Sequence, residues 1–517
     1  MAKYIPYSYE QGQLISVIFA KQILPGTFEF ALNQLINEKL DLSIFDDKFC
    51  NDKTGAPAYD PRILLKIILF AYSRGIIHSR EIAACCRNNI IFMALSAHSR
   101  PHFTTIANFI SSMDKEIIPL FQKVLLVCDE AGLIGREMFA IDGCKLPSNA
   151  SKEWSGTKAD FKKKAHKIKN TIEKIVHRHQ TMDCTDPIDI KIKNRETQQV
   201  KTLDDQLHKI QDWLEDKTDR KGSSGNIVKS NITDNDSAKM KTSKGVIQGY
   251  NGLSMVDSMS QIIVTASAYG HSHEQATLEP MIHQTRENFL ETTGEKDVFS
   301  KTILTADSGF HSEKNMQMLS AEEIDAYIAD PKMRSRDPRF DNADRFKTRS
   351  QKERKRKNPP KNKFKTEDFI FDENLKYCIC PANKKLYRSG RVTIKNHEYT
   401  KFKGPKNACI PCKLRSKCLQ NHRKTEIRQV AYPHGISKDA KETFSDKMRQ
   451  KIDTALGRSI YSRRVAVAEP PFAQIRHILK LNRFSLRGKK KVNIQWLLYC
   501  MIHNLRRWYN CTQAIKP

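Results

Sequence analysis

Apolar residues in the first part of the chain recur at the spacing of a helix. From Ile63 to Ala71 they lie three and four positions apart, which places them on one helix face. Pro61 suits the first turn of that helix, and Asp60 suits the capping position before it. This pattern predicts a helical amino-terminal domain over residues 1–130.

The pattern changes at Met138, where a short apolar run ends in Asp142. Such a run predicts a buried strand with a carboxylate at its end. A second run, Thr302–Asp307, has the same form. The other elements predicted here are strands over 249–256, 261–268 and 326–329 and helices over 273–288 and 312–320. This order predicts an α/β fold with the mixed sheet of an RNase H-like catalytic core over residues 131–335.

Further segments extend this core. Residues 158–217 carry apolar residues at helical spacing on both sides of Pro187, which predicts an antiparallel helical hairpin after the first strand. The polar, glycine-containing residues 218–243 predict a loop. We expect residues 336–435 to form a basic, cysteine-rich insertion, and residues 436–517 to be helical and to complete the core.

The net charge of the chain indicates which class of partner it binds. Its 517 residues include 88 Lys and Arg against 58 Asp and Glu, a net charge of +30. Such an excess argues against an ordinary neutral metabolic enzyme, and it favours a polyanionic partner, most often nucleic acid, over a merely solvated basic surface. No apolar run approaches the roughly 18–20 residues that cross a membrane, and the amino terminus lacks a signal-peptide pattern. We therefore expect a cytoplasmic, nucleoid-associated protein.

Five of the 13 cysteines fall between residues 378 and 418. Cys378-Ile-Cys380 and Cys409-Ile-Pro-Cys412 are paired thiols, and Cys418 follows them. Four thiolates make a closed structural zinc site, and the second pair has the usual spacing for one. The sequence leaves open which four of the five cysteines would bind zinc. A group of thiols without metal is the alternative. The odd total and the scattered remainder argue against a secreted disulfide framework.

Three carboxylates stand out by position: Asp142, Asp307 and Glu469. The first two end predicted strands, and acids at strand ends converge beyond the carboxyl edge of an open α/β sheet. Such oxygen donors suit Mg²⁺ or Mn²⁺, and two ions about 4 Å apart activate water and stabilise the leaving oxygen of a phosphodiester. Each acid alone also has an ordinary interpretation, as a turn residue or as a solvated helix residue.

These acids belong to longer motifs. The first two blocks are Ile141-Asp-Gly-Cys-Lys-Leu-Pro-Ser-Asn-Ala-Ser151 and Ala306-Asp-Ser-Gly-Phe-His-Ser312, and a third contains Tyr461, Arg464, Glu469 and Arg476. Together they resemble the DDE insertion-sequence transposases, in particular the group with a Tyr-Arg-Glu-Lys signature. Residues 55–66, 79–82 and 101–109 resemble the amino-terminal helical domain of that group, 249–257 its hairpin, and 482–488 with 504–505 its tail.

The resemblance implies roles for the residues of the three blocks. Asp142, Asp307 and Glu469 would bind two Mg²⁺ or Mn²⁺ ions. The residues implied to contact DNA phosphates near the cleaved end are Tyr461, Arg464 and Arg476. Arg476 stands where the signature has lysine, which keeps the charge but replaces a point donor by a fork. Four residues separate Arg464 from Glu469, where the signature usually has three.

The function implied is that of a DNA transposase. We expect a homodimer or larger assembly that binds the terminal inverted repeats of an insertion sequence in double-stranded DNA, cuts a strand and joins the freed 3′-hydroxyl to target DNA. The amino-terminal helical domain would take part in binding the DNA ends. An RNase H-like nuclease without strand transfer and a catalytically inactive transposase-derived DNA-binding protein are the alternatives. A zinc-dependent enzyme is disfavoured, because the cysteine cluster has no obvious open coordination position for a substrate.

Overall fold

The computed structural model describes residues 17–48, 57–181, 187–222, 225–242, 245–340, 363–394, 397–421, 424–436 and 442–514. The chain forms two compact units, one of Met1–Pro331 with Thr454–Pro517 and the other of Lys332–Asp453. The predicted helical domain, the sheet and the helices after residue 453 are part of the first unit. The helix Phe444–Asp453, expected in the carboxyl-terminal part of the core, belongs to the second unit. Residues 55 and 56, which begin the amino-terminal motif, lie outside the described residues.

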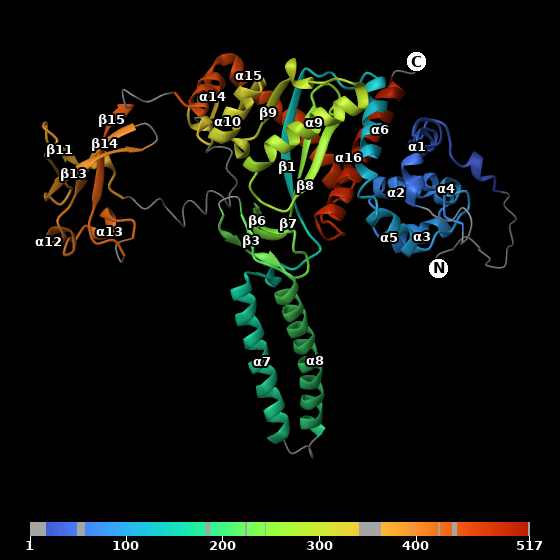
Figure 1. The fold of residues 1–517 in the computed structure, drawn as a ribbon, viewed down its shortest axis with the longest axis horizontal. Helices are drawn as coiled ribbons and strands as arrows, with labels where there is room; N and C mark the ends of the chain where they lie inside the picture. Colours follow the sequence, from blue (N-terminus) through green and yellow to red (C-terminus); the bar gives the residue numbers. More distant parts are fainter. Residues whose placement is uncertain are drawn as a thin grey trace, which may run out of the picture. The chain divides into compact units, whose positions relative to one another are not determined.

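A six-stranded sheet forms the centre of the first unit (Figure 1). Its strands are β1 (Met138–Pro147), β6 (Ala238–Thr242), β7 (Gly245–Asp257), β8 (Ile263–Tyr269), β9 (Ile303–Ala306) and β10 (Ala326–Ile328). β1, β9 and β10 are parallel, whereas β7 is antiparallel to β1 and to β8. The resulting order β8-β7-β1-β9-β10 is that of an RNase H-like sheet, which confirms the predicted fold class.

The helices that follow these strands pack on the sheet. α9 (Leu278–Thr293) and α16 (Lys489–Ala514) contact β8, whereas α15 (Ala455–Ala473) contacts β1, β7, β9 and β10. α10 (Glu313–Ala321) connects β9 to β10. The helices predicted around 273–288 and 312–320 are therefore present. α9 begins later than expected, because a 3-10 turn, Gln275–Thr277, precedes it.

Two asparagines of α16 satisfy the backbone of β8. Asn504 donates to the Ile263 carbonyl and accepts from the Ile263 N–H, both at 2.8 Å, and Asn493 accepts from the Ala268 N–H at 2.8 Å. Eleven residues complete slightly more than three helical turns, so both asparagines face the same way. The helix thus replaces the neighbouring strand that β8 lacks on this side.

Asn504→Ala should lower the free energy of unfolding by about 2–4 kcal/mol, because it leaves a buried N–H and a buried C=O without partners. Urea or thermal unfolding of the whole chain measures the loss. Asn170→Ala is the matched control, since Asn170 is exposed on the helical hairpin and contacts only exposed His166, and it should change stability by less than about 0.5 kcal/mol. Equal stabilities of the two variants would contradict this role of Asn504.

The amino-terminal helices pack against α16. They are α1 (Phe28–Gln34), α2 (Pro61–Ser73), α3 (Ser79–Asn88), α4 (Ile90–Leu95), α5 (Phe103–Ser111) and α6 (Ile117–Glu130). The Asp60 carboxylate accepts from Arg62 N at 2.7 Å and Pro61 begins α2, as predicted. Tyr72 of α2 stacks on Tyr499 of α16 with ring centroids 5.2 Å apart. Packing is thus one role of this domain, and DNA binding by it stays a prediction.

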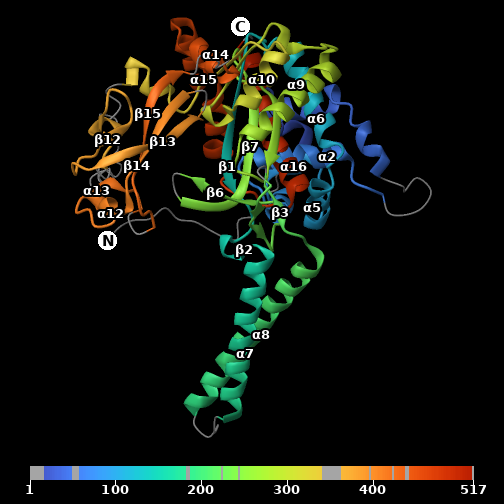
Figure 2. The same ribbon diagram turned by 60° about the vertical axis from the view of Figure 1, so that its left-hand side comes forward.

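The predicted helical hairpin is present as α7 (Lys158–Thr181) and α8 (Pro187–Asp216), which lie side by side and extend from the sheet (Figures 1 and 2). Phe161 and Trp213 make an edge contact at 4.8 Å near the base of the hairpin, and Ile168 and Ile210 are buried with them. The apolar residues at helical spacing therefore hold the two helices together.

The prediction of a loop over residues 218–243 is wrong in part. β6 pairs with the first residues of β7 and extends the sheet. The other short strands here are β3 (Arg220–Lys221), β4 (Ile227–Val228) and β5 (Ser230–Asn231), which pairs with β2 (Ser155–Gly156). Only Met240 of β6 is a fully buried hydrophobic residue, and lysines flank it. One apolar residue is too weak a pattern to predict a strand.

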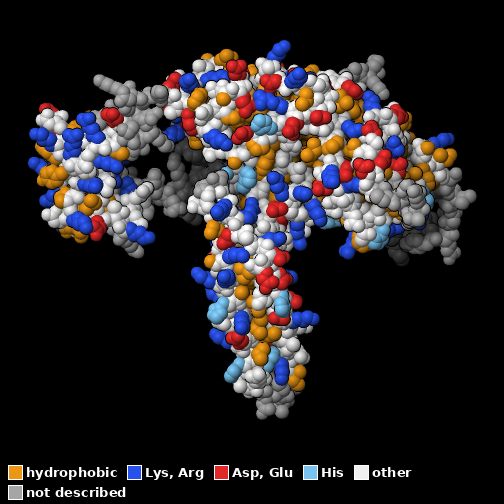
Figure 3. All heavy atoms as spheres, in the orientation of Figure 1, with side chains coloured by type: hydrophobic (Ala, Val, Ile, Leu, Met, Phe, Trp, Pro, Cys, Tyr) orange, Lys and Arg blue, Asp and Glu red, His pale blue; other side chains and the backbone are white. Residues whose placement is uncertain are grey.

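The second unit is an antiparallel sheet of β11 (Ile370–Phe371), β12 (Tyr377–Ile379), β13 (Lys385–Ile394), β14 (His397–Lys403) and β15 (Gln429–Ile436) in that order. The short helices α12 (Lys406–Cys409) and α13 (Arg415–Cys418) lie between β14 and β15, and α14 (Phe444–Asp453) follows. On the face drawn in Figure 3, basic side chains are more frequent than acidic ones over this unit. In the described parts of both units, no helix is long and apolar enough to cross a membrane.

Candidate active site

The sheet places Asp142 and Asp307 at the same level. β1 and β9 are parallel, and Ile141 lies opposite Ala306 at the last position of their pairing. Asp142 is the next residue of β1, and Asp307 is the first residue after β9. Because both segments run in the same direction, the two aspartates leave the paired strands side by side at one edge of the sheet. This is the convergence that the sequence predicted for them.

A buried arginine joins the two aspartates. Arg464 of α15 has one terminal guanidinium nitrogen 2.9 Å from Asp142 Oδ2 and the other 3.6 Å from Asp307 Oδ1. Its side chain is only 9% exposed. Burial raises the pKa of the Asp142 carboxyl, and Arg464 together with the Gly143 N–H opposes that rise. The site therefore holds two carboxylates around one cation in a partly buried position.

Glu469 lies further along the same helix and is exposed. Among the described side chains, no hydrogen bond or ion pair joins it to either aspartate. Five residues of an α-helix turn through about 140°, so Glu469 points away from the direction in which Arg464 reaches the aspartates. With the three intervening residues of the signature, the two side chains would lie on the same side of the helix. The fourth intervening residue of this chain turns Glu469 away from Arg464. The structure brings together two of the three predicted acids and leaves the third apart.

Two prolines follow Glu469 within α15, and they remove backbone hydrogen bonds of the helix at this point. Pro470 and Pro471 have no N–H to donate to the carbonyls one turn earlier. The Gln261 side chain donates to one of those carbonyls, that of Ala466, at 3.1 Å. The hydrogen-bonding pattern then changes to a π-helical turn over Gln474–Ile478. The segment after Glu469 is therefore the least regular part of this helix.

The remaining residues of the third block also lie near β1. The Tyr461 ring centroid is 5.7 Å from the Arg464 guanidinium carbon, a cation–π distance. Arg476, in the π-helical turn, hydrogen-bonds the Cys144 thiol and lowers its pKa, although burial, the larger effect, raises it. Both side chains therefore lie beside the β1 segment that contains Asp142, and their predicted contacts with DNA stay predictions.

The sequence analysis missed a fourth acidic residue, Glu274. Its Oε1 accepts a hydrogen bond from Asn251 Nδ2 at 3.2 Å and lies 3.7 Å from Lys145 Nζ. A Cβ added at Gly309 would lie 2.1 Å from Glu274 Oε2, so this carboxylate packs on the backbone just after Asp307. Four segments far apart in the sequence meet here, and no sequence pattern marks Glu274.

The electrostatic environment of Glu274 links it to the aspartate pair. Burial raises the pKa of its carboxyl, Lys145 and Asn251 lower it, and the charges of Asp142 and Asp307 raise it again. Glu274 therefore adds negative charge to the sheet edge that holds the aspartates. It also limits the space at Gly309, which explains why the second motif has glycine at this position.

The donors at this edge fit a hard divalent cation. Asp142 and Asp307 offer carboxylate oxygens, which Mg²⁺ and Mn²⁺ prefer as ligands. The guanidinium of Arg464 already lies between them, which shows that the position attracts positive charge. Within the described ranges, no three His, Cys, Asp or Glu side chains are already arranged as a metal-binding group. A third ligand therefore has to approach the pair.

The five cysteines of the second unit separate into two groups. Cys378 lies in β12 and is fully buried in a hydrophobic cluster. The other four, Cys380, Cys409, Cys412 and Cys418, line one common cavity.

Two family models match the chain outside its first two catalytic blocks. One, a transposase domain (DUF772), matches residues 18–112 and spans α1–α5. The other, a transposase DDE domain, matches residues 379–509 and includes Arg464 and Glu469. These two matches support a DDE-type insertion-sequence transposase. No curated protein matches it.

The DDE-domain match begins in the second unit and continues into α16. The cysteine-rich unit thus lies, in the sequence, between the second and third motif blocks. Asp142 and Asp307 lie outside both matched ranges, so their assignment depends on their motifs and on their positions in the sheet.

Proposed function

We propose that the chain is a DNA transposase that binds the terminal inverted repeats of an insertion sequence, cleaves a DNA strand and transfers it to target DNA. The proposal is supported above all by Arg464, which holds Asp142 and Asp307 together although the three residues come from segments far apart in the sequence. The matches to two transposase family models support the same reaction class.

Asp142, Asp307 and Glu469 are the residues that would hold two Mg²⁺ or Mn²⁺ ions. Bound ions of this kind supply an activated water and stabilise the leaving oxygen of a phosphodiester. The two aspartates provide fixed negative charge on the rigid edge of a sheet, and Arg464 balances that charge. Glu469 lies beside the prolines and the π-helical turn, where a change in helix geometry costs the least hydrogen bonding. We therefore infer that Glu469 turns toward the aspartates when ions and DNA bind.

Double-stranded DNA is the partner that the charge favours, since the chain carries a net charge of +30. We propose that Tyr461, Arg464 and Arg476 contact phosphates near the cleaved end, because all three lie beside the β1 segment that contains Asp142. Association with the nucleoid and assembly as a homodimer or larger on DNA belong to the same proposal. The predicted structural zinc ion is a separate proposal, because it concerns the other unit and different residues.

Strand transfer distinguishes a transposase from a nuclease that uses the same acids. The test supplies a duplex with an already exposed 3′-hydroxyl at the element end, together with supercoiled target DNA and Mg²⁺. We expect covalently joined end–target products. Cleavage without joining would support the nuclease alternative, and binding without either would support the inactive DNA-binding protein.

A matched substrate controls for the chemistry of the end. A duplex that ends in a 3′-deoxynucleotide binds in the same way but has no hydroxyl with which to attack. Joined products should disappear with this substrate, while binding to the end remains. Joining that persists would contradict attack by the 3′-hydroxyl.

A further inference from the structure

Four of the five clustered thiols surround one small cavity in the second unit. Cys380, Cys409, Cys412 and Cys418 line a space of about 30 Å³. Each of them is only partly buried. Cys380 lies in the turn after β12, Cys409 ends α12, Cys418 ends α13, and Cys412 lies in the segment that joins these two short helices. Two parts of the sequence thus bring their thiols to one place.

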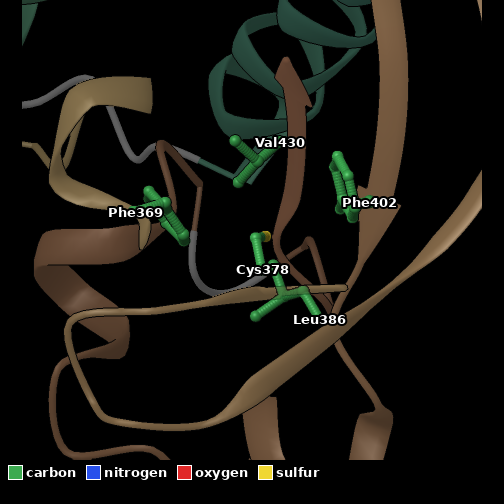
Figure 4. Packing of buried hydrophobic residues seen from close by; sticks show 5 residues of the cluster. All are labelled: Phe369, Cys378, Leu386, Phe402 and Val430. Atoms are coloured by element: carbon green, nitrogen blue, oxygen red, sulfur yellow. The ribbon is translucent and has the colours of Figure 1, made fainter. Parts of the chain in front are cut away.

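The fifth thiol has a different environment. Cys378 is 0% exposed and belongs to the core of the second unit, with Phe369, Leu386, Phe402 and Val430 around it (Figure 4). Its neighbour Cys380, two residues along the chain, lines the cavity instead. Cys378 is not among the residues that line the cavity. It behaves as a small apolar core residue.

We propose that Cys380, Cys409, Cys412 and Cys418 bind one structural Zn²⁺ ion and that Cys378 is not a ligand. This inference is independent of the reaction proposed above, because it concerns the folding of the second unit. It also resolves which four of the five cysteines form the site, a choice that the sequence left open.

The turn after β12 presents Cys380 in the way that a metal-bound thiolate needs. The Lys384 N–H points at the Cys380 sulfur at 3.4 Å, and such N–H donors stabilise a thiolate. The turn is closed by hydrogen bonds from Asn383 N to the Cys380 carbonyl at 2.7 Å and from Cys380 N to the Lys384 carbonyl at 2.9 Å. Asn383 adopts a positive φ of 57°, which asparagine tolerates better than most residues.

Cys409 and Cys418 are held in place by a close glycine and by two arginines. A Cβ at Gly404 would lie 2.5 Å from the Cys409 sulfur, so only glycine leaves room for this thiol. Arg415 donates to the Cys409 carbonyl at 2.9 Å, and Arg428 donates to the Cys418 carbonyl at 3.0 Å. These bonds fix the backbone on both sides of the cavity.

Charge and size favour a metal ion over bare thiols. Four thiolates around Zn²⁺ carry a net charge of −2, which the arginines beside Cys409 and Cys418 balance. The core of this unit is small, and small domains commonly rely on a metal or disulfides.

The thiols of the second unit do not yet form a tetrahedral group in the described residues. This is expected for a site whose ligands lose protons and move together only when the metal binds. Four cysteines of the first unit, Cys86, Cys128, Cys144 and Cys500, are buried. In the part of the chain that the structure describes, the cavity of the second unit is where four thiols line one common space.

The metal content of the full chain tests the inference. Protein produced with zinc in the medium and exchanged into metal-free buffer should contain about one Zn²⁺ per chain by elemental analysis. Cys412→Ser and Cys418→Ser should each lose most of this zinc, whereas Cys378→Ala should keep it. Wild-type protein without zinc would overturn the proposal, and so would loss of zinc in Cys378→Ala with retention in Cys418→Ser.

Absorption spectroscopy of the Co²⁺-substituted wild-type chain tests the ligand set without any variant, so it applies even if a variant does not fold. Co²⁺ bound in place of zinc should give strong thiolate-to-cobalt charge-transfer bands with the intensity of four thiolate ligands. Bands with the intensity of two thiolates or fewer would overturn the assignment. Both measurements are made without DNA, so their outcome is distinguishable from failure of the proposed transposase reaction.

Discussion

Asp307→Asn and Asp142→Asn should each reduce strand cleavage by about 10²–10³-fold or more, with the chain still folded. Asparagine keeps the size of the side chain but removes the charge that a divalent cation needs. In the wild-type chain the Gly143 N–H donates to the Asp142 carboxylate at 2.7 Å. The amide oxygen of the asparagine introduced at position 142 can still accept this hydrogen bond. The single-turnover rate of cleavage of an end-containing duplex in Mg²⁺ measures the effect.

A nearby acid–arginine pair provides the matched control. Glu137 precedes β1 and pairs with Arg463, the residue beside Arg464, at 3.0 Å, and both side chains are largely exposed. Glu137→Gln therefore removes an ion pair of the same kind between the same two parts of the fold, and it should cut DNA at nearly the wild-type rate. If a folded Asp307→Asn protein also retained the wild-type rate, the aspartate pair would not be the catalytic site.

Gly309→Ala should reduce cleavage by about 10²-fold, since a displacement of about 1 Å near the reacting groups has effects of this size. The new Cβ would lie 2.1 Å from Glu274 Oε2, and Asn251 and Lys145 hold that carboxylate in place. Either Glu274 or the segment after Asp307 must move. Gly309 has no positive φ, so the expected effect comes from this collision and not from backbone strain.

Combining this change with a second substitution separates the collision from other causes. Glu274→Ala removes the atom that the new Cβ meets, so Gly309→Ala should have little further effect in that background. Such non-additivity is the signature of residues in contact. Glu279→Ala is the control, because Glu279 is an exposed residue of α9 that pairs only with Lys314. Additive effects of Gly309→Ala and Glu274→Ala in free energy would contradict the proposed contact.

The elements that position the aspartates were predictable because each carries its own pattern. The apolar runs before Asp142 and Asp307 are short and buried, and they form neighbouring parallel strands. The helical hairpin was equally clear, since its apolar residues keep helical spacing over many turns. Local periodicity thus determined the sheet and the position of two acids.

The missed features depend on contacts between distant segments. Glu274 meets Asn251, Lys145 and Gly309 only in the folded chain. The sequence indicated Arg464 as a DNA contact, and it gave no sign that Arg464 also pairs with the two aspartates. Five cysteines looked equivalent, but β12 directs Cys378 into the core. The sequence shows which residues are candidates for a site, and only tertiary packing decides which of these residues contact one another.

The most direct test of the account is cleavage of a duplex that carries the ends of the insertion sequence, by the wild-type chain, in Mg²⁺ and in EDTA. The account predicts a strand cut at the element end that exposes a 3′-hydroxyl in Mg²⁺ and no cut in EDTA. Specific binding of the ends without cleavage in either Mg²⁺ or Mn²⁺ would contradict it, and the chain would then be a DNA-binding protein that has lost the reaction of its family.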